Sequence, residues 1–235
     1  MRAVRKMLPV YTLTLLLVLF CSLLAPEAVT AFSEAPKGSG LPTVVLDPGH
    51  GGEDGGAVSP GGVGESNLNL AISLRTRELL RFLGISVVMT RETERSLHSP
   101  EAGSISEKKV SDLKNRVAFV SQIPNPVLVS IHQNMFSQSK YCGAQVFYSK
   151  TAGSKALAEA LQARISTCLD PANHRQAKPS EKVYLLEQIS CPGVLVECGF
   201  LSNPREEALL QTEAYQKKLA AVLSATLAEQ LTSDK

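Results

Sequence analysis

The sequence predicts an α/β fold with parallel strand pairing, and three features support this prediction. Short, apolar, β-branched segments alternate with longer segments that have the periodicity of amphipathic helices. The first three elements run strand, helix, strand, which is the order that pairs two strands in parallel. The chain has 235 residues, of which 44% are hydrophobic and 20% charged, a balance that suits one globular domain.

Several segments are expected to form strands because they are short and rich in β-branched or aromatic residues. In chain order they are Thr43–Leu46, Ile85–Met89, Val127–Ile131, Gln145–Tyr148 and Val194–Glu197. The third and the last of them are almost wholly apolar, which is typical of strands buried on both faces of a sheet. A helix over Glu65–Leu83 is expected between the first two strands.

A second helix is expected after the second strand. Ser104 and Glu107 have the spacing of a capping box, which predicts a helix start. The helix that follows places Val110, Leu113 and Val117 on one apolar face.

The second half of the chain predicts three more helices. One carries apolar residues at helical spacing over residues 157–165. Asn203 followed by Pro204 is a typical helix start, with the proline at the first helical position. The last helix is expected over Glu213–Leu231.

The N-terminal segment has the composition of an export signal. Three basic residues precede the charge-free, leucine-rich run Met7–Pro26, and Val29–Ala31 offers a small-residue cleavage site. Residues 1–31 are therefore predicted to be a signal peptide, or a signal anchor because a run of roughly 20 apolar residues can span a bilayer. Residues 32–42 are rich in Pro, Gly and Ser and are predicted to be a linker. The folded domain is expected over residues 43–231.

Charge and cysteine usage exclude some function classes. Without residues 1–31 the chain loses three of its 24 basic residues and one of its 22 acidic residues, and it then has no net charge. Such a balance argues against nucleic-acid binding. The four remaining cysteines lack the C-x-x-C spacing of structural zinc sites, and disulfides and free thiols fit them equally well. They are Cys142, Cys168, Cys191 and Cys198.

Two candidate functional residues flank the first loop. His50 follows the first strand within the glycine-rich turn Asp47–Gly52, where other groups can approach closely. The imidazole is placed to bind a ligand, although a turn or capping role fits this segment equally well. Glu65 opens the next helix, where the helix dipole stabilises any carboxylate, so taken alone it indicates only capping.

Two further candidates lie on buried strands. Alternation places Ser130 and His132 on the same side of an apolar strand. A polar side chain there needs a partner, so His132 is either a hydrogen-bonded core residue or a ligand. Glu197 ends the last apolar strand, where burial should raise its pKa and suit it to proton transfer. The alternative for Glu197 is an ion pair with a nearby arginine.

Together the four candidates indicate metal-dependent hydrolysis. Two histidines and one glutamate form a familiar catalytic zinc set that leaves a fourth position for water. The remaining glutamate can take the proton of water as it attacks a carbonyl group, which is the chemistry of amide hydrolysis. The glycines around His50 lack the Lys-Ser/Thr ending of a phosphate-binding loop, which argues against nucleotide chemistry.

Four segments resemble the zinc-dependent N-acetylmuramoyl-L-alanine amidases. They are Leu46–Gly52, the helix start at Glu65, Ser130–Asn134 and Val196–Asn203, and they occur in the expected order within residues 43–231. The resemblance implies that these residues form an amidase catalytic domain. It also implies a three-layer α/β sandwich around a mostly parallel central sheet flanked by helices.

The resemblance assigns roles to the candidate residues. It implies that His50, Glu65 and His132 bind Zn²⁺ and that Glu197 is the catalytic general base and acid. The implied substrate is peptidoglycan, cleaved at the amide bond between N-acetylmuramic acid and L-alanine. One departure is Ser66 after Glu65, where family members often have lysine.

Within this family the chain is most similar to the CwlD type. A short domain behind an N-terminal membrane segment, together with residues 141–148 and 183–186, carries this similarity. The type acts in spore cortex maturation, where amidase cleavage leads to the muramic-δ-lactam needed for germination. Because the sequence shows no wall-binding repeats, control is expected from the N-terminal segment or an accessory protein of unknown identity. The expected location is outside the cytoplasmic membrane, secreted or anchored, in the forespore cortex space.

Two other function classes stay open. Another zinc peptidase, such as a carboxypeptidase, would need a basic group to hold a free terminal carboxylate. A non-catalytic wall-binding protein would keep the fold without turnover, but all four chemical positions are intact, which argues against it. Arg175 and Lys178 lie in a polar loop and fit a site for a substrate carboxylate or a solvated surface equally well.

Overall fold

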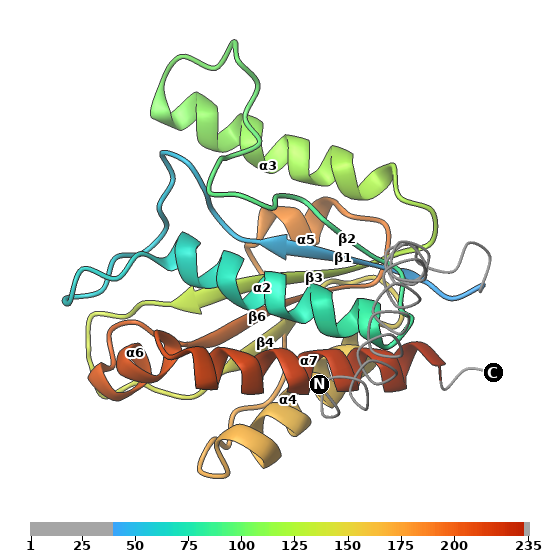
Figure 1. Cartoon of the computed structure of the whole chain (residues 1–235). Helices are drawn as coiled ribbons and strands as arrows, with labels where there is room; N and C mark the ends of the chain where they lie inside the picture. The colour runs from blue at the N-terminus through green and yellow to red at the C-terminus, as the bar shows by residue number, and fades with distance from the viewer. Residues whose placement is uncertain (1–39, 233–235) are drawn as a thin grey trace, which may run out of the picture. The chain divides into compact units, whose positions relative to one another are not determined.

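The computed structural model describes residues 40–232, which fold around a six-stranded sheet (Figure 1). The predicted signal segment, residues 1–31, and most of the predicted linker, residues 32–42, lie outside the described residues. The strand order is β2-β1-β3-β6-β4-β5. The two strands at the centre of this order, β3 and β6, are those that the sequence identifies as most apolar.

The strands are β1 (Thr43–Pro48), β2 (Val87–Met89), β3 (Pro126–Asn134), β4 (Gln145–Tyr148), β5 (Lys178–Pro179) and β6 (Gly193–Phe200). Strands β2, β1, β3 and β6 pair in parallel, whereas β4 runs antiparallel to β6. The predicted, mostly parallel sheet is therefore confirmed. The sequence does not predict β5, because two residues are too short to show a strand period.

The helices are α2 (Glu65–Phe82), α3 (Ile105–Ser121), α4 (Ser154–Leu169), α5 (Tyr184–Gln188), α6 (Pro204–Leu210) and α7 (Glu213–Thr232). Helices α2, α4 and α7 pack against one face of the sheet, and α3 and α5 pack against the other (Figure 1). The predicted three-layer sandwich is confirmed. So are two predicted helix starts, the capping box of Ser104 with Glu107 and the Asn203 cap before Pro204.

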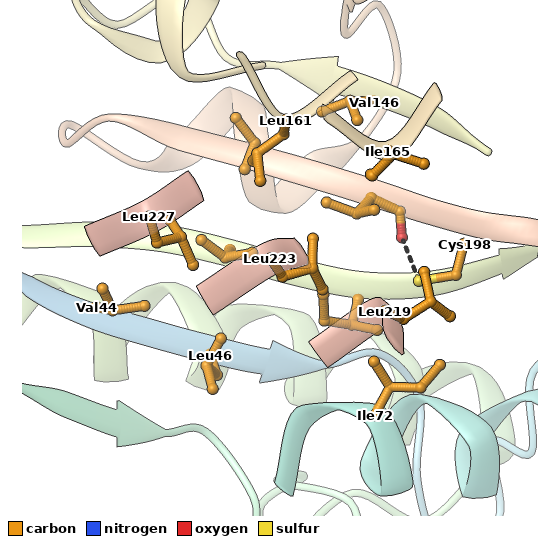
Figure 2. Close-up of a cluster of buried hydrophobic side chains, with 14 of the residues drawn as sticks. Val44, Leu46, Ile72, Val146, Leu161, Ile165, Cys198, Leu219, Leu223 and Leu227 are labelled. Atoms are coloured by element: carbon orange, nitrogen blue, oxygen red, sulfur yellow. Dashed lines mark hydrogen bonds between the residues drawn. The ribbon is translucent and has the colours of Figure 1, made fainter. Parts of the chain in front are cut away.

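Alternate residues of each central strand serve the two faces of the sheet. Val44 and Leu46 of β1 belong to the larger apolar core, and Val45 belongs to the smaller core on the opposite face. Figure 2 shows the larger core, in which Leu219 and Leu223 of α7 lie among side chains of the sheet and of α2 and α4. Burial on both faces holds the strands in place and fixes where their carboxyl ends lie.

Helix α3 uses only part of its predicted apolar face for this packing, because Val117 packs against the smaller core whereas two other residues of that face do not. Val110 is 50% exposed and Leu113 is also exposed. The buried residues of the helix are instead Asp112, Arg116 and Val120. The reason is electrostatic: Arg116 reaches Asp47 at the end of β1, and both charges are buried, so they stay paired on the inner side of the helix.

The four cysteines within the described residues are free thiols. Cys142 and Cys168 are exposed, whereas Cys191 and Cys198 are buried. No helix between residues 40 and 232 combines the length and the apolar character needed to cross a membrane.

Candidate metal centre

The four candidate residues meet at the carboxyl edge of the sheet. His50 follows β1, and Glu65 is the first residue of α2. His132 lies in β3, directly opposite Glu197 in the parallel pairing of β3 with β6. Three segments far apart in the sequence are therefore brought together because parallel strands end at the same edge.

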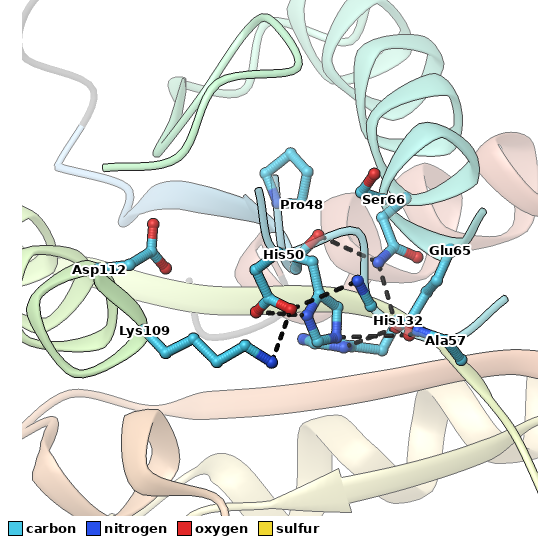
Figure 3. A network of polar contacts seen from close by, with 12 residues as sticks. Pro48, His50, Ala57, Glu65, Ser66, Lys109, Asp112 and His132 are labelled. Atoms are coloured by element: carbon cyan, nitrogen blue, oxygen red, sulfur yellow. Dashed lines mark hydrogen bonds and ion pairs between the residues drawn. The ribbon is translucent and has the colours of Figure 1, made fainter. Parts of the chain in front are cut away.

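The carboxylate of Glu65 lies between the two imidazoles (Figure 3). Its Oε2 is 3.3 Å from Nε2 of His50, and its Oε1 is 3.0 Å from Nδ1 of His132. The ligand atoms of the three residues all lie within 4.8 Å of one another. Two ligand atoms about 2.1 Å from a tetrahedral zinc ion are about 3.4 Å apart, so the two distances from Glu65 to the histidines are close to those that such an ion needs.

Backbone and amide groups hold the Glu65 carboxylate in this position. The backbone N–H groups of Gln133 and Ala57 donate to it at 3.1 and 2.9 Å, and Asn69 donates from its side chain at 3.3 Å. Burial alone would raise the pKa of Glu65, but hydrogen bonds and charge interactions with the two histidines lower it far below its usual range. The group is therefore an anion, which is the form in which a carboxyl group can bind a metal.

Two glycines make room for the cluster. A Cβ atom on Gly49 would lie 2.2 Å from Nε2 of His132, and one on Gly56 would lie 2.6 Å from Oε2 of Glu65. Neither distance is possible between non-bonded atoms. The glycine-rich loop after β1 is thus needed for close approach to both side chains.

The turn that carries His50 is strained and is held by a buried arginine. His50 has a φ of 62°, a region that side chains with a Cβ rarely adopt. Arg116 of α3 donates to the backbone oxygens of His50 and Pro48 at 2.7 and 2.9 Å. It also pairs with Asp47 at 2.6 Å. Burial raises the pKa of Asp47, but Arg116, Ser130 and Thr90 outweigh it and lower the pKa to about 2.

A second buried arginine also holds this turn. Arg91 donates to the backbone oxygens of Pro48, Gly49 and Ser66, each at 2.9 Å. It therefore ties the turn that carries His50 to the first turn of α2, where Glu65 lies. The sequence gives no periodic signal for Arg91, because it lies just after the short strand β2.

Asp54 is a further residue that the sequence analysis did not identify. Its Oδ2 is 2.9 Å from Nδ1 of His50, and Lys109 of α3 lies 3.0 Å from its other oxygen (Figure 3). Burial lowers the pKa of His50, but Glu65 and Asp54 outweigh it and raise the pKa to about 9. A metal at this site must therefore displace a firmly held proton.

Glu197 differs from Glu65 because its side chain has no hydrogen-bond partner within residues 40–232. Its Oε2 is a buried oxygen that no donor contacts among the described residues. Burial raises the pKa of Glu197 to about 7, with a further rise from Glu65 and an opposing effect of the two histidines. The arginine pair offered as an alternative is not formed within residues 40–232. An unpaired carboxyl group with a pKa near neutrality, beside a cluster of metal-ligand type, is suited to proton transfer.

Arg175, a candidate for binding a substrate carboxylate, contacts Phe200 and Cys142. Its guanidinium group lies 4.9 Å from the centre of the Phe200 ring, and its Nε donates to the backbone oxygen of Cys142 at 2.9 Å. These contacts hold the arginine near the end of β6, three residues beyond Glu197. They leave both interpretations of Arg175, a carboxylate site or a solvated surface, open.

Comparison with known proteins identifies the family. Residues 44–229 match the N-acetylmuramoyl-L-alanine amidase family. The chain belongs to this family. A curated relative, the germination-specific N-acetylmuramoyl-L-alanine amidase of Bacillus subtilis (strain 168), is 38% identical over 179 residues, which are 76% of this chain and 75% of the relative. AmiA, an N-acetylmuramoyl-L-alanine amidase of Escherichia coli (strain K12), is 30% identical and matches 81% of this chain and 76% of its own.

Solved structures agree with this membership. The CwlD amidase from Clostridioides difficile, solved in complex with the GerS lipoprotein, is 41% identical with a TM-score of 0.79. The match covers 82% of this chain and all of the CwlD chain (100%). The predicted family, the predicted similarity to the CwlD type and the predicted amidase activity are confirmed.

Proposed function

We propose that this amidase uses a zinc ion to hydrolyse the amide bond between N-acetylmuramic acid and L-alanine in peptidoglycan. His50, Glu65 and His132 would hold the ion, and Glu197 would carry the proton. One observation carries the proposal: the Glu65 carboxylate contacts two imidazoles at 3.3 and 3.0 Å, and the buried Oε2 of Glu197 beside it has no hydrogen-bond partner among residues 40–232. No structural role within the described residues explains why Glu197 is left unpaired. A proton carrier, in contrast, needs a carboxylate oxygen that is not already occupied by a hydrogen bond.

Each group of the proposed site has its own role in the hydrolysis. When bound, zinc supplies a Lewis acid that polarises the amide carbonyl and acidifies water. Glu197 accepts the proton of the attacking water and then donates it to the leaving nitrogen of L-alanine as the C–N bond breaks. A pKa near 7 allows one carboxyl group to act first as base and then as acid at neutral pH. Glu65 stays ionised throughout, because its pKa is far lower.

We infer that the peptidoglycan concerned is spore cortex. Two relatives support this inference: the germination-specific amidase of B. subtilis and the CwlD amidase of C. difficile. They share 38% and 41% identity with the chain over most of its described length. The expected product of the cleavage is a muramic acid residue free of its stem peptide, which is the precursor of muramic-δ-lactam.

The organisation of the chain is part of the same proposal. We propose residues 1–31 as a signal peptide or anchor, 32–42 as a linker and 43–231 as the catalytic domain. The domain would then act outside the cytoplasmic membrane, in the forespore cortex space. We also propose that an accessory protein assists it, and the complex of the C. difficile CwlD amidase with a lipoprotein supports this.

The test compares residues 32–235 with the Glu197→Gln variant on purified cortex peptidoglycan. We expect one zinc ion per chain in both proteins and release of stem peptides with an L-alanine amino terminus by the wild type. The variant should lose about 100- to 10,000-fold in rate, because the proton carrier is gone while the ligands remain. Zinc content is measured by atomic emission and the products by mass spectrometry.

A matched control is Glu159→Gln, an exposed position on α4 that should keep wild-type rate. Turnover by Glu197→Gln at the rate of this control would remove Glu197 from the mechanism. Release of single amino acids from peptide ends would identify a carboxypeptidase instead. Binding to peptidoglycan with neither zinc nor product would identify a wall-binding protein, whereas zinc binding without product would indicate that the accessory protein is required.

A further inference from the structure

His50 offers its two ring nitrogens to two different carboxylates. Nε2 faces Glu65 at 3.3 Å, and Nδ1 faces Asp54 at 2.9 Å. A neutral imidazole has one N–H donor and one acceptor nitrogen. A proton on Nδ1, shared with Asp54, leaves the lone pair of Nε2 directed towards Glu65.

Asp54 is itself fixed, so it can orient the ring. Its backbone forms two hydrogen bonds with Gly51, one in each direction, which close the loop after β1. Its Oδ1 pairs with Lys109 at 3.0 Å and accepts from the backbone of Gly56 at 3.4 Å. Backbone and side chain are therefore both held, and Oδ2 remains for His50.

The two histidines differ in their need for such support. His132 lies near the carboxyl end of β3, where its backbone pairs with Glu197 of β6, and its Nε2 packs against the backbone of Gly49. His50 lies in a turn with a φ of 62° and has no strand pairing to fix its ring. Only His50 has a second carboxylate at its other ring nitrogen.

We propose that Asp54 is the positioning residue of the metal centre, which holds His50 in the tautomer that presents Nε2 to the metal. Lys109 makes helix α3 part of this arrangement, because it holds the far oxygen of Asp54. The proposal rests on the zinc site of the proposed function. A carboxylate that accepts the second N–H of a histidine ligand typically changes metal affinity by 10- to 100-fold when removed.

The adjacent residue provides a matched control. Glu53 also carries a carboxylate and also pairs with a lysine of α3, Lys108 at 2.5 Å, but it does not contact His50. Asp54→Asn and Glu53→Gln each remove one acidic charge from the same loop and break one pair with α3. A general effect of charge or of loop docking on α3 should therefore appear equally in both variants.

The experiment measures the zinc dissociation constant of the purified protein by competition with a chromophoric chelator. We expect Asp54→Asn to bind zinc about 10- to 100-fold more weakly and Glu53→Gln to stay within about twofold of wild type. The visible absorption of the Co²⁺-substituted protein should change in Asp54→Asn alone. Equal affinity and equal spectra in the two variants would overturn the proposal.

A measurement on the wild type does not depend on how a variant folds. NMR of the imidazole nitrogens in the zinc-loaded protein should show His50 coordinated through Nε2 with its proton on Nδ1. His132, whose Nδ1 faces Glu65, should show the opposite assignment. Coordination of His50 through Nδ1 would overturn the role of Asp54. Failure of the wild type to bind zinc would instead overturn the proposed function itself.

Discussion

The two halves of the proposed metal centre are positioned by different forces. His132 and Glu197 lie opposite each other on paired central strands, so the backbone ladder and the apolar core fix them. His50 lies in a strained turn, and charged side chains that come from the segment after β2, from α3 and from the loop itself fix it. The strand half is thus held by packing, and the loop half by a buried network of hydrogen bonds and ion pairs.

This difference predicts which single substitutions each half of the site tolerates. Hydrophobic packing is spread over many contacts, and no single charge decides it. A buried charge network depends on every member, because removal of one partner leaves another charge unpaired in a low-dielectric interior. Single substitutions that remove a charge should therefore damage the loop half far more than the sheet.

The largest effect is expected from Arg116→Met. The substitution leaves Asp47 and Asp112 without their buried cation and frees the backbone oxygens of Pro48 and His50. We expect a loss of about 3 to 5 kcal/mol in the free energy of unfolding, measured by urea denaturation.

The control for this prediction is Arg164→Met, which breaks an exposed pair between α4 and α7 and should cost less than about 1 kcal/mol. A similar, small loss in both variants would show that the Arg116 network contributes little to stability. The loop half would then be held by its backbone alone.

The next largest effect is expected from Gly49→Ala, which breaks the contact between the two halves. The new Cβ would lie 2.1 Å from Cε1 of His132, so the imidazole must move away from Glu65. We expect activity to fall by at least about 100-fold, because displacement of a reacting group by about 1 Å has this effect, and zinc content to fall with it. Gly55→Ala in the same loop meets no atom within 4 Å and should leave both unchanged. Full zinc content in Gly49→Ala would show that the loop moves away and that the imidazole of His132 keeps its position.

The strand half could be predicted from the sequence. The apolar runs around Val129 and Val194 predict buried strands, and a polar residue at the end of such a run has few structural explanations. His132 and Glu197 were identified on that basis, and the parallel order of the strands placed them at one edge. The positions of His50 and Glu65 followed from the strand and the helix beside them.

The network of the loop half could not be predicted in this way. On α3 the sequence shows an apolar face with Val110, whereas the structure buries Arg116 on another face. Arg91 and Asp54 lie in irregular segments that have no period. Arg91 bonds to backbone oxygens and Asp54 to a ring nitrogen, and no sequence pattern indicates such partners. Only the three-dimensional arrangement shows that these charges converge on one turn.

The smallest expected effect is one of pH, and its sign differs between the two halves. Asp47 has its pKa lowered to about 2, so its contribution to stability is present above pH 4 and is lost as pH falls towards 2. Glu197 has its pKa raised from 4.5 to about 7 by burial. It therefore favours folding in its protonated form, and that stability is lost as pH rises from about 5 to 7.

Glu197→Gln should consequently stabilise the metal-free protein at pH 8 relative to wild type, by about 2 kcal/mol, but not at pH 5. An amide avoids the cost of a buried charge at high pH and resembles the neutral carboxyl group at low pH. Urea denaturation of chelator-treated protein at the two pH values measures the difference. Asp47→Asn should behave in the opposite way, destabilising the protein at pH 5 and much less at pH 2. If Glu197→Gln had the same effect at pH 5 and pH 8, Glu197 would be ionised in the fold at both, and its unpaired oxygen would need another explanation.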